Sequence, residues 1–380
     1  MKTKKIKIAV AMSGGVDSAV AAKLLKDQGH EVVGFFLHFW KEPGAGAAEN
    51  KCCSTEALLD ARRVANKIGI RLYTMNFSGI FKKQVVDNFL REYAAGRTPN
   101  PCVVCNKQVK LGHLIKQAKK LGFDYVASGH YARLQREFPI SNPPAGGQFL
   151  KNACKLLKAK DKEKDQSYFL YTFNQNELAH ILFPLGDYTK KQVRELAKKF
   201  KLPVAEKKES QEICFIAERG HNEFLKRHLE LRPGPIKFLR EQRGLASKLE
   251  AKPLIGIHQG LPLYTVGQRR GIEIGGTGPY YAAEMDYKTN ILYVVNNFAD
   301  QILYKDELTA KNVNWIVPPR KLPLLCQAVI RYRHKPVPCR VIKSGKNYRV
   351  DFAESQRAVT PGQSVVFYAG EEILGGGIIA

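Results

Sequence analysis

The sequence of 380 residues lacks long apolar runs. None approaches the ~20 apolar residues that a membrane-spanning helix needs. The N-terminal stretch MKTKKIKIAVAM contains basic residues but only a short apolar run, and it has no small-residue cleavage site, so it is a poor secretory signal. Internal repeats and low-complexity tracts are also missing. We therefore expect a cytoplasmic protein that does not associate with membranes.

Acidic residues are few compared with basic ones. Asp and Glu number 35 against 61 Lys and Arg, which gives a formal net charge of +26. An excess that runs through nearly every segment favours a polyanionic partner such as nucleic acid. The alternative is that the charge only keeps a soluble protein apart from its copies. No long apolar stripe is left over for self-association, so we expect a monomer.

Structural disulfides are not expected from the eight cysteines, because the expected compartment is reducing. Cys102 and Cys105 form a C-x-x-C at the predicted start of a helix, where Arg97 and Lys107 nearby in sequence favour the thiolate. No second C-x-x-C supplies the four ligands of a closed zinc site, so the pair is at most a zinc half-site. Cys214, in ESQEICFI, is either a third reactive thiol or a buried core residue.

The first part of the chain alternates short β-type runs with helical runs, from Lys5 to about Ser128. Strands that are apolar throughout favour a parallel sheet with helices on both faces and ligands at the carboxyl ends of the strands. The turn-forming segment SNPPAGGQ, residues 141–148, is interpreted as a surface loop or hairpin tip. We predict that this α/β domain covers residues 1–217.

The pattern changes after this domain. Gly- and Pro-rich pieces such as LRPGPIK and GIHQGLPLYTVGQRRGIEIGG indicate a small middle domain over residues 218–288. From residue 290 onward, ILYVVNN, NVNWIV, CQAVIRYR and later runs are short alternating strands separated by turns. This spacing predicts a C-terminal antiparallel β-barrel over residues 289–380.

The stretch MSGGVDSAV, Met12 to Val20, lies between a predicted strand and a predicted helix. A helix start presents unpaired backbone N–H groups to an anion, glycines let a phosphate approach, and Ser13 and Ser18 can donate hydroxyl hydrogen bonds. The Gly-Lys-Ser/Thr ending of a Walker A loop is missing. Asp17 would repel phosphates unless a divalent cation lay between them, so we expect Mg²⁺ beside it.

The motif SGGVDS resembles the PP-loop of the ATP pyrophosphatases, which hold the pyrophosphate of ATP while a carbonyl oxygen is adenylated. Further motifs follow in order: AGRTPNPC with CNK, ASGHYAR, KDQSYFL, ICFI, YTVGQRRG, and RYR followed by TPGQ. Together they resemble the MnmA-type tRNA-specific 2-thiouridylase family over nearly the whole chain, from Ala11 to Gln363. The resemblance implies a PP-loop α/β fold and ATP-dependent replacement of the C2 oxygen of the wobble uridine, U34, by sulfur.

The resemblance also implies roles for individual residues. Those expected to contact ATP are Ala11, Met12, Ser13, Gly14, Gly15, Val16, Asp17, Ser18, Leu37 and Gly129. Those expected to meet the target base are Asn100, Pro101 and Cys102. Further contacts with tRNA are expected from His130, Lys164, Asp165, Gln166, Arg331, Tyr332 and Gln363. Cys214 aligns with the cysteine that carries a persulfide, received from a donor protein, and Cys105 with the one that closes a disulfide after transfer.

One position departs from the family pattern. Many members read NPD-x-x-C, with the aspartate assigned as general base, whereas this chain reads NPC-x-x-C with Cys102 at that position. A Cys102 thiolate could accept the proton instead. Alternatively, Cys102, Cys105 and Cys214 could ligate a [4Fe–4S] cluster with one iron open to sulfide. A PP-loop synthetase that transfers nitrogen and an RNA-binding module without activity are the remaining alternatives.

Overall fold

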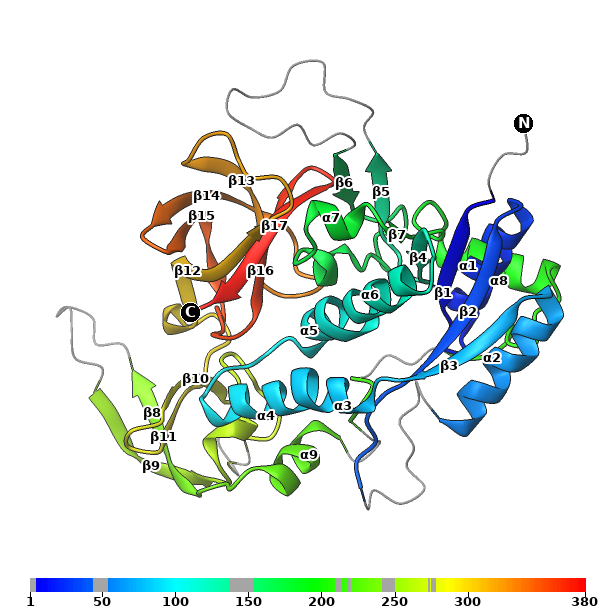
Figure 1. The fold of residues 1–380 in the computed structure, drawn as a ribbon. Helices are drawn as coiled ribbons and strands as arrows, with labels where there is room; N and C mark the ends of the chain where they lie inside the picture. Colours follow the sequence, from blue (N-terminus) through cyan, green and yellow to red (C-terminus); the bar gives the residue numbers. More distant parts are fainter. Residues whose placement is uncertain are drawn as a thin grey trace.

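The computed structural model describes residues 5–43, 54–136, 153–208, 213–216, 220–240, 250–272, 274 and 278–380. Figure 1 shows an α/β domain on the right, a β-barrel at the upper left and a smaller sheet domain at the lower left. Segment 141–148 and the predicted boundary at 217/218 lie outside the described residues, as do two further cysteines that follow each other in the chain, Cys52 and Cys53. In the part of the chain that is described, no helix is both long and apolar enough to cross a membrane.

The predicted parallel sheet is confirmed. Its strands lie in the order β3-β2-β1-β4-β7, with all neighbours parallel. Their bounds are Lys7–Ala11 for β1, Glu31–His38 for β2, Arg71–Asn76 for β3, Tyr125–Ala127 for β4 and Ile181–Leu182 for β7. The central strand β1 is buried from its second residue onward, which is why its sequence is apolar throughout.

Helices cover both faces of this sheet. Ile8 and Val10 of β1 face a core formed with α1 (Val16–Asp27), α2 (Thr55–Ile68) and α8 (Lys190–Lys199). Ala9 and Ala11 alternate with them and face the larger core on the other side. Local signals fix the helix ends: the Ser54 hydroxyl accepts from the Ala57 N–H at the start of α2, which ends at Gly69.

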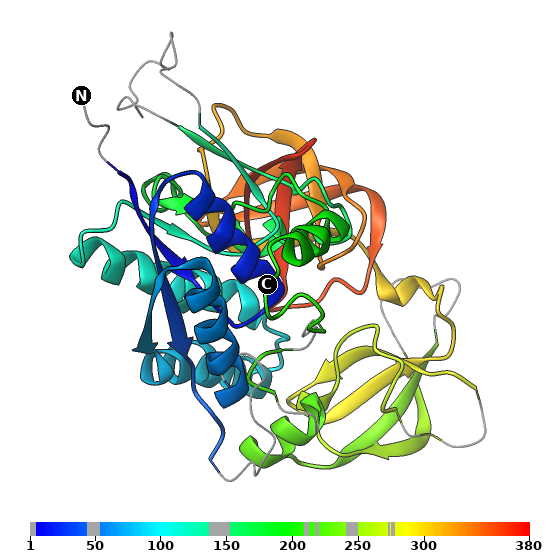
Figure 2. The ribbon, with the colours of Figure 1, turned by 90° about the vertical axis from the view of Figure 1, so that its right-hand side faces the viewer.

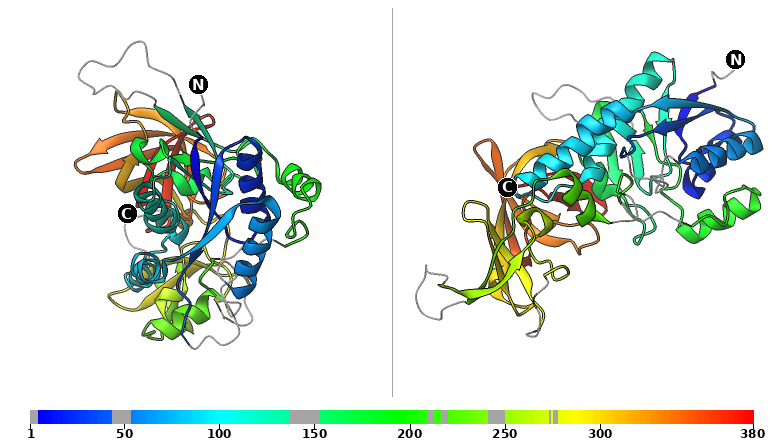
Figure 3. Two further views of the ribbon diagram at one scale, coloured as in Figure 1. Left: turned by 45° about the vertical axis from the view of Figure 1, so that its right-hand side comes forward. Right: turned by 90° about the horizontal axis from the view of Figure 1, so that it is seen from below.

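Two helical runs lie between the sheet and the other domains, as Figure 3 shows. The first comprises α3 (Ser78–Phe81), a π-helical segment (Lys82–Val86) and α4 (Asp87–Ala94). The second comprises α5 (Pro101–Cys105), a π-helical segment (Asn106–Lys110) and α6 (Gly112–Lys120). Pro101 occupies the first turn of α5, where its missing N–H is not needed. The C-x-x-C therefore lies at the start of a helical run, as the sequence predicted.

The smaller domain contains a four-stranded sheet in the order β10-β11-β8-β9 and the helix α9 (His221–His228). The strands are β8 (Gly234–Arg240), β9 (Glu250–His258), β10 (Tyr281–Asp286) and β11 (Ile291–Val295). Figure 2 shows this domain beside the barrel. The assignment of ILYVVNN to the barrel was wrong: β11 pairs with β10 and β8, because a short turn returns the chain directly alongside β10.

The C-terminal barrel is confirmed, with strands in the order β12-β15-β14-β13-β16-β17 and closure by pairing of β12 with β17. The strands are β12 (Tyr304–Trp315), β13 (Leu324–Val329), β14 (Val337–Ser344), β15 (Asn347–Arg357), β16 (Ser364–Ala369) and β17 (Glu372–Ile379). Their inward side chains form a separate apolar core.

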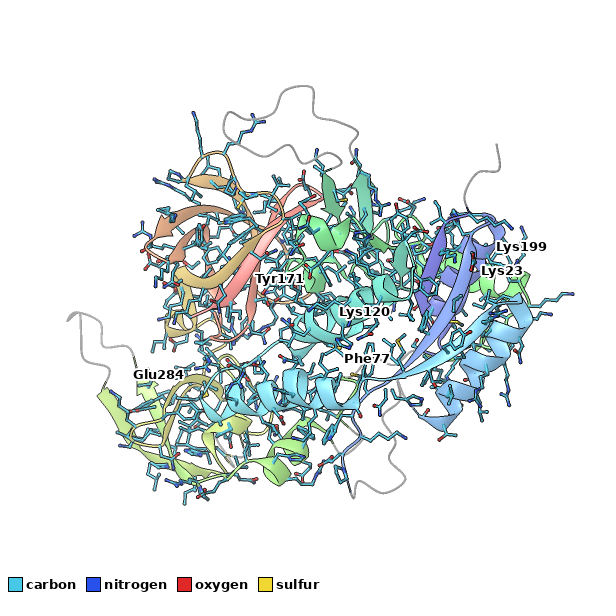
Figure 4. All side chains as sticks on the ribbon, in the orientation of Figure 1. Lys23, Phe77, Lys120, Tyr171, Lys199 and Glu284 are labelled. Carbon is cyan, nitrogen blue, oxygen red and sulfur yellow. The ribbon has the colours of Figure 1, made fainter. Side chains whose placement is uncertain are left out.

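A hairpin from the α/β part extends the barrel sheet. Its strands β5 (Arg133–Arg136) and β6 (Cys154–Leu157) flank segment 141–148 and pair antiparallel, and β6 continues the sheet beside β17. The buried Tyr171, labelled in Figure 4, lies at the same boundary: its hydroxyl is 3.2 Å from Ser364 Oγ and 3.4 Å from the Gly377 carbonyl oxygen. The barrel is thus fixed to the α/β domain by a shared sheet and by buried side chains.

Candidate active site

The SGGVDS loop joins the carboxyl end of β1 to the start of α1. The backbone N–H of Met12 donates to the Phe35 carbonyl of β2 at 2.9 Å, which holds the end of β1 in the sheet. Ser18 Oγ accepts from the Ser13 N–H at 3.2 Å and donates to the Gly15 carbonyl at 3.1 Å. Gly15 precedes α1 and offers no side-chain cap, so the first turn of a 12-residue helix presents its N–H groups as an anion site.

Asp17 is tied to two side chains that sequence reasoning did not select. Its Oδ1 accepts from Lys190 Nζ at 2.7 Å and from the Tyr131 hydroxyl at 2.9 Å. Lys190 is the first residue of α8, and its side chain is only 11% exposed. Its backbone N–H donates to Asp161 Oδ2 at 2.8 Å, which fixes the helix start. The sequence YTKK indicates the start of a helix, but it does not show that the Lys190 side chain would face Asp17.

The loop after β4 packs directly against the PP-loop. A Cβ at Gly129 would lie 2.8 Å from both the Asp17 carbonyl carbon and the Ser18 nitrogen, so this approach requires glycine. Leu37, near the end of β2, is buried in the core. His130 is 6% exposed, and its Nδ1 lies 2.8 Å from Ser128 Oγ. Burial, reinforced by the nearby charge of Lys110, lowers the pKa of His130 well below 6.5, so the ring is neutral at pH 7.

The three candidate cysteines lie on two segments. Cys102 is exposed and Cys105 half-buried on α5, whereas Cys214 lies half-buried in residues 213–216. Cys105 and Cys214 both pack against the larger core of the molecule. The neighbouring Phe215 is fully buried against Phe81 and Phe89, which fixes the Cys214 segment beside α3 and α4.

The two inorganic groups expected from the sequence, Mg²⁺ and a [4Fe–4S] cluster, require different donor sets. Within the described ranges, no group of three or more His, Cys, Asp or Glu side chains is placed to hold a metal ion, so Cys102, Cys105 and Cys214 are not gathered around a common point in this structure. Mg²⁺ needs less from the protein, because it commonly uses one or two carboxylates together with substrate phosphates and water. Asp17 beside the PP-loop fits that requirement.

The residues expected to contact tRNA are spread over the α/β domain and the barrel. A cavity of about 740 Å³ between these domains is lined by Lys158, Lys162, Lys164, Tyr168, Tyr332 and Arg333, among others. Asp165 also lines it, but its carboxylate accepts from Ala159 N, Ser167 N and Ser167 Oγ, so it holds its own loop in place. Burial raises the pKa of Asp165 despite these hydrogen bonds.

Three further residues of the expected set make contacts within the protein. Gln166 Oε1 accepts from the Tyr131 N–H at 3.0 Å. This hydrogen bond links the loop after β4, which packs against the PP-loop, to the segment that lines the cavity. Arg331 is half-buried and donates to Thr360 Oγ1 at 3.1 Å. Gln363 Nε2 donates to the Thr98 carbonyl at 3.0 Å, just before Asn100 and Pro101. The structure therefore places Gln363, an expected tRNA contact, beside the segment that carries the residues expected to meet the target base.

A strand–SGGVDS–helix site on a five-stranded parallel sheet, followed by two β domains, defines the class: a PP-loop nucleotide-binding α/β protein with an appended middle domain and barrel. Family models match the three parts in order. They are described as the tRNA methyl transferase HUP domain over residues 6–218, the tRNA methyl transferase PRC-barrel domain over 222–296 and the aminomethyltransferase beta-barrel domain over 305–379.

Curated relatives are similar over nearly their full lengths. The tRNA-specific 2-thiouridylase MnmA 2 of Caldanaerobacter subterraneus subsp. tengcongensis is 44% identical over 383 residues, covering 99% of this chain and 98% of that protein. The MnmA of Geobacter metallireducens is 43% identical, covering 98% and 96%, and that of Clostridioides difficile is 41% identical, covering 98% of each. The chain belongs to the family of MnmA-type tRNA-specific 2-thiouridylases.

Proposed function

We propose that this enzyme uses ATP to replace the C2 oxygen of the wobble uridine of tRNA by sulfur, releasing AMP and pyrophosphate. The observation that carries the proposal is a PP-loop at the carboxyl end of β1, in a chain 41–44% identical over almost its whole length to the three 2-thiouridylases named above. The high positive charge supports a tRNA substrate, and the reaction is expected to take place in the cytoplasm.

Adenylation comes first because the C2 carbonyl is a poor electrophile. Its oxygen attacks the α-phosphorus of ATP, pyrophosphate leaves, and the oxygen becomes part of a phosphate ester that departs readily. The PP-loop N–H groups and Lys190 stabilise the charge that develops on the pyrophosphate. Asp17 would hold Mg²⁺ together with phosphate oxygens, and the ion would neutralise part of the same charge. Ala11 to Ser18, Leu37 and Gly129 form the ATP site in this proposal.

Sulfur transfer then uses the two half-buried cysteines. The terminal sulfur of a Cys214 persulfide, loaded by a donor protein, adds to C2 of the adenylated base. The Cys105 thiolate attacks Cys214 Sγ, the sulfur–sulfur bond breaks toward the new C2 sulfur, and AMP leaves with the original oxygen. A Cys105–Cys214 disulfide remains, and a dithiol reductant restores the two thiols. Cys102 stands where many family members have an aspartate as general base. Its thiolate accepts the proton that the uridine loses.

The tRNA itself is proposed to lie across the seam between the α/β domain and the barrel. The target base must leave the anticodon stack, which costs less for a loop nucleotide than for a paired one. The site that receives it includes Asn100, Pro101 and Cys102. The other residues proposed to contact the tRNA lie along this seam: Lys164, Asp165, Gln166, Arg331, Tyr332 and Gln363. The buried His130 supports the site from inside the protein. Their roles are inferred from the family pattern and from the shared seam.

The decisive experiment is thiolation of tRNA by anaerobically purified protein, with ATP, Mg²⁺ and a persulfide donor, after removal of iron by chelation. Mass spectrometry of the nucleosides should show one sulfur in the wobble uridine. The amount of AMP released should equal the amount of sulfur incorporated. Cys105→Ser and Cys214→Ser should abolish product, whereas Cys326→Ser on β13 is the matched control and should not. A nitrogen-containing product, or tRNA binding without ATP turnover, would overturn the proposal.

Iron content separates the two sulfur chemistries. Activity in the iron-free protein would support the persulfide route. Activity that appears only with about four irons per chain would instead assign Cys102, Cys105 and Cys214 as ligands.

A further inference from the structure

The five residues before α5, Gly96 to Asn100, belong to the α/β domain and are contacted by both other domains; we call them the junction segment. From the barrel, the Pro361 carbonyl accepts from the Thr98 N–H at 2.8 Å. From the middle domain, Thr265 Oγ1 lies 3.0 Å from Thr98 Oγ1. The Tyr287 ring lies so close to Gly96 that a Cβ there would be 2.5 Å from its Cε2 atom. The position of this segment therefore depends on how the domains are assembled.

Gln363 makes the central contact with the junction segment. Its Nε2 donates to the Thr98 carbonyl at 3.0 Å and approaches the Pro99 carbonyl at 3.4 Å. A regular helix cannot satisfy these carbonyls, because Pro99 and Pro101 hold the residues before them, Thr98 and Asn100, extended. Part-buried carbonyls need a donor, and the Gln363 amide supplies one to Thr98 and also approaches Pro99.

The backbone of Gln363 is itself held rigidly by the barrel. Its carbonyl accepts from the Ile379 N–H at 2.8 Å, and the N–H of Gly362 donates to the Ile379 carbonyl at 2.9 Å, so the loop is fastened to β17. Gly362 has a φ of +90°, and a Cβ there would lie 2.9 Å from Arg97 Cβ and from the Thr98 nitrogen. Only glycine permits both the backbone conformation and this close packing.

We propose that Gln363 is a positioning residue that sets where α5 begins, and with it the orientation of Asn100 and Cys102 toward the target base. The inference rests on the proposed function, and it assigns Gln363 a task that does not require contact with tRNA. Asn100 directly precedes α5, and Cys102 is its second residue, so a shift of the Thr98 and Pro99 carbonyls moves both. Displacement of reacting groups by about 1 Å can cost on the order of 10²-fold in rate.

The test compares Gln363→Met, which removes both hydrogen bonds at similar size, with the matched control Gln356→Met. Gln356 lies on β15 of the same barrel, and its amide donates to the Glu354 carbonyl. Two readouts are taken: kcat and KM for tRNA thiolation, and the rate at which iodoacetamide alkylates Cys102 in protein without tRNA, followed by mass spectrometry. Thermal unfolding checks that each variant is folded.

We expect Gln363→Met to lower kcat about tenfold or more while KM for tRNA changes less than about threefold. The alkylation rate of Cys102 should change at least about threefold in the free protein, because its position changes before any tRNA binds. Thr265→Val, which loosens the same segment from the middle-domain side, should shift both readouts in the same direction. Gln356→Met should leave both at the wild-type values.

An increase in KM with unchanged kcat and unchanged Cys102 alkylation would overturn the inference, since Gln363 would then act only through tRNA. If Gln363→Met does not fold, Thr265→Val decides by the same two readouts. If wild-type protein does not thiolate tRNA, the proposed function fails, and the alkylation rates still decide whether Gln363 positions Cys102.

Discussion

Lys190 Nζ lies 2.7 Å from Asp17 Oδ1, although the two residues are 173 positions apart in the chain. This ion pair places a largely buried cation at the PP-loop, which lacks the lysine of a Walker A loop. Tyr131, in the loop between β4 and β5, also donates its hydroxyl to Asp17 Oδ1 and so ties that loop to α1. A positive charge at this loop therefore comes from the start of α8.

Replacing Lys190 by methionine should slow adenylation about 10²-fold, because a preorganised charge near the departing pyrophosphate is lost. The rate of AMP formation with saturating ATP and tRNA measures the effect. Lys191→Met is the matched control, since Lys191 is the next residue of α8 and is exposed. Equal rates for the two variants would show that Lys190 serves only to hold α8 against α1.

Asp17→Asn combined with Lys190→Met should be less damaging than the two single effects multiplied together. Each single change leaves one charge without its partner, and residues in contact typically show coupling of about 0.5–3 kcal/mol. A double-mutant cycle on the AMP-forming rate measures the coupling. Strictly additive effects would mean that the pair acts as two separate groups during the reaction.

Affinity for tRNA should fall steeply with salt, and part of the slope should come from the cavity between the domains. Lys162→Ala and Arg333→Ala are each expected to reduce the slope of log K against log salt by about 0.7–0.9 if each contacts one phosphate. Filter binding at several salt concentrations measures it. Lys346→Ala, at the exposed turn between β14 and β15, should leave the slope unchanged; equal losses for all three would place the tRNA elsewhere.

The boundary between barrel and α/β domain should weaken when the Tyr171 hydroxyl is removed. Burial raises the pKa of Tyr171 to about 12, so the hydroxyl remains a neutral donor at pH 7. Tyr171→Phe leaves Ser364 Oγ and the Gly377 carbonyl without this partner and should cost about 1 kcal/mol in unfolding free energy. Urea denaturation measures it, with Tyr73→Phe as control because Tyr73 is 50% exposed. A similar loss in both variants would contradict the assignment.

Stability should decline below about pH 6.5, partly because of His130. The pKa of His130 is lowered in the folded protein, so the unfolded chain binds more protons between that value and 6.5. Its contribution is complete above pH 6.5 and is lost as the pH falls. His130→Asn, which keeps a polar atom near Ser128, should reduce the slope of unfolding free energy between pH 6.5 and 5 by up to about 1.4 kcal/mol per pH unit.

Two other histidines will preserve part of that slope. The pKa values of His221 and His258 are also lowered, mainly by burial. An unchanged slope in His130→Asn would show that the pKa of His130 is not lowered in the folded protein, so that both states bind the proton equally. Urea titrations at several pH values decide between the two results.

Local sequence signals were enough to predict the elements and the geometry of the nucleotide loop. The apolar runs of β1 and β2, the SGGVDS turn and the helix starts at Ser54 and Thr189 are local signals, because strand burial, turn conformation and capping involve residues only a few positions apart. The parallel sheet and the barrel followed from the spacing of such segments. The family pattern supplied the expected roles of the cysteines and the residues proposed to contact tRNA.

Tertiary structure alone decided which distant residues meet. Gln363 reaches the Thr98 carbonyl across 265 positions, β6 joins the sheet of the barrel, and β11 pairs with β8 in place of barrel strands. Lys190 looks like any exposed helical lysine in the sequence, yet it points at Asp17. Hydrophobic periodicity and capping residues predict whether a residue is buried and which secondary structure its segment adopts. The partner across a domain boundary depends on how the domains pack, which no local pattern encodes.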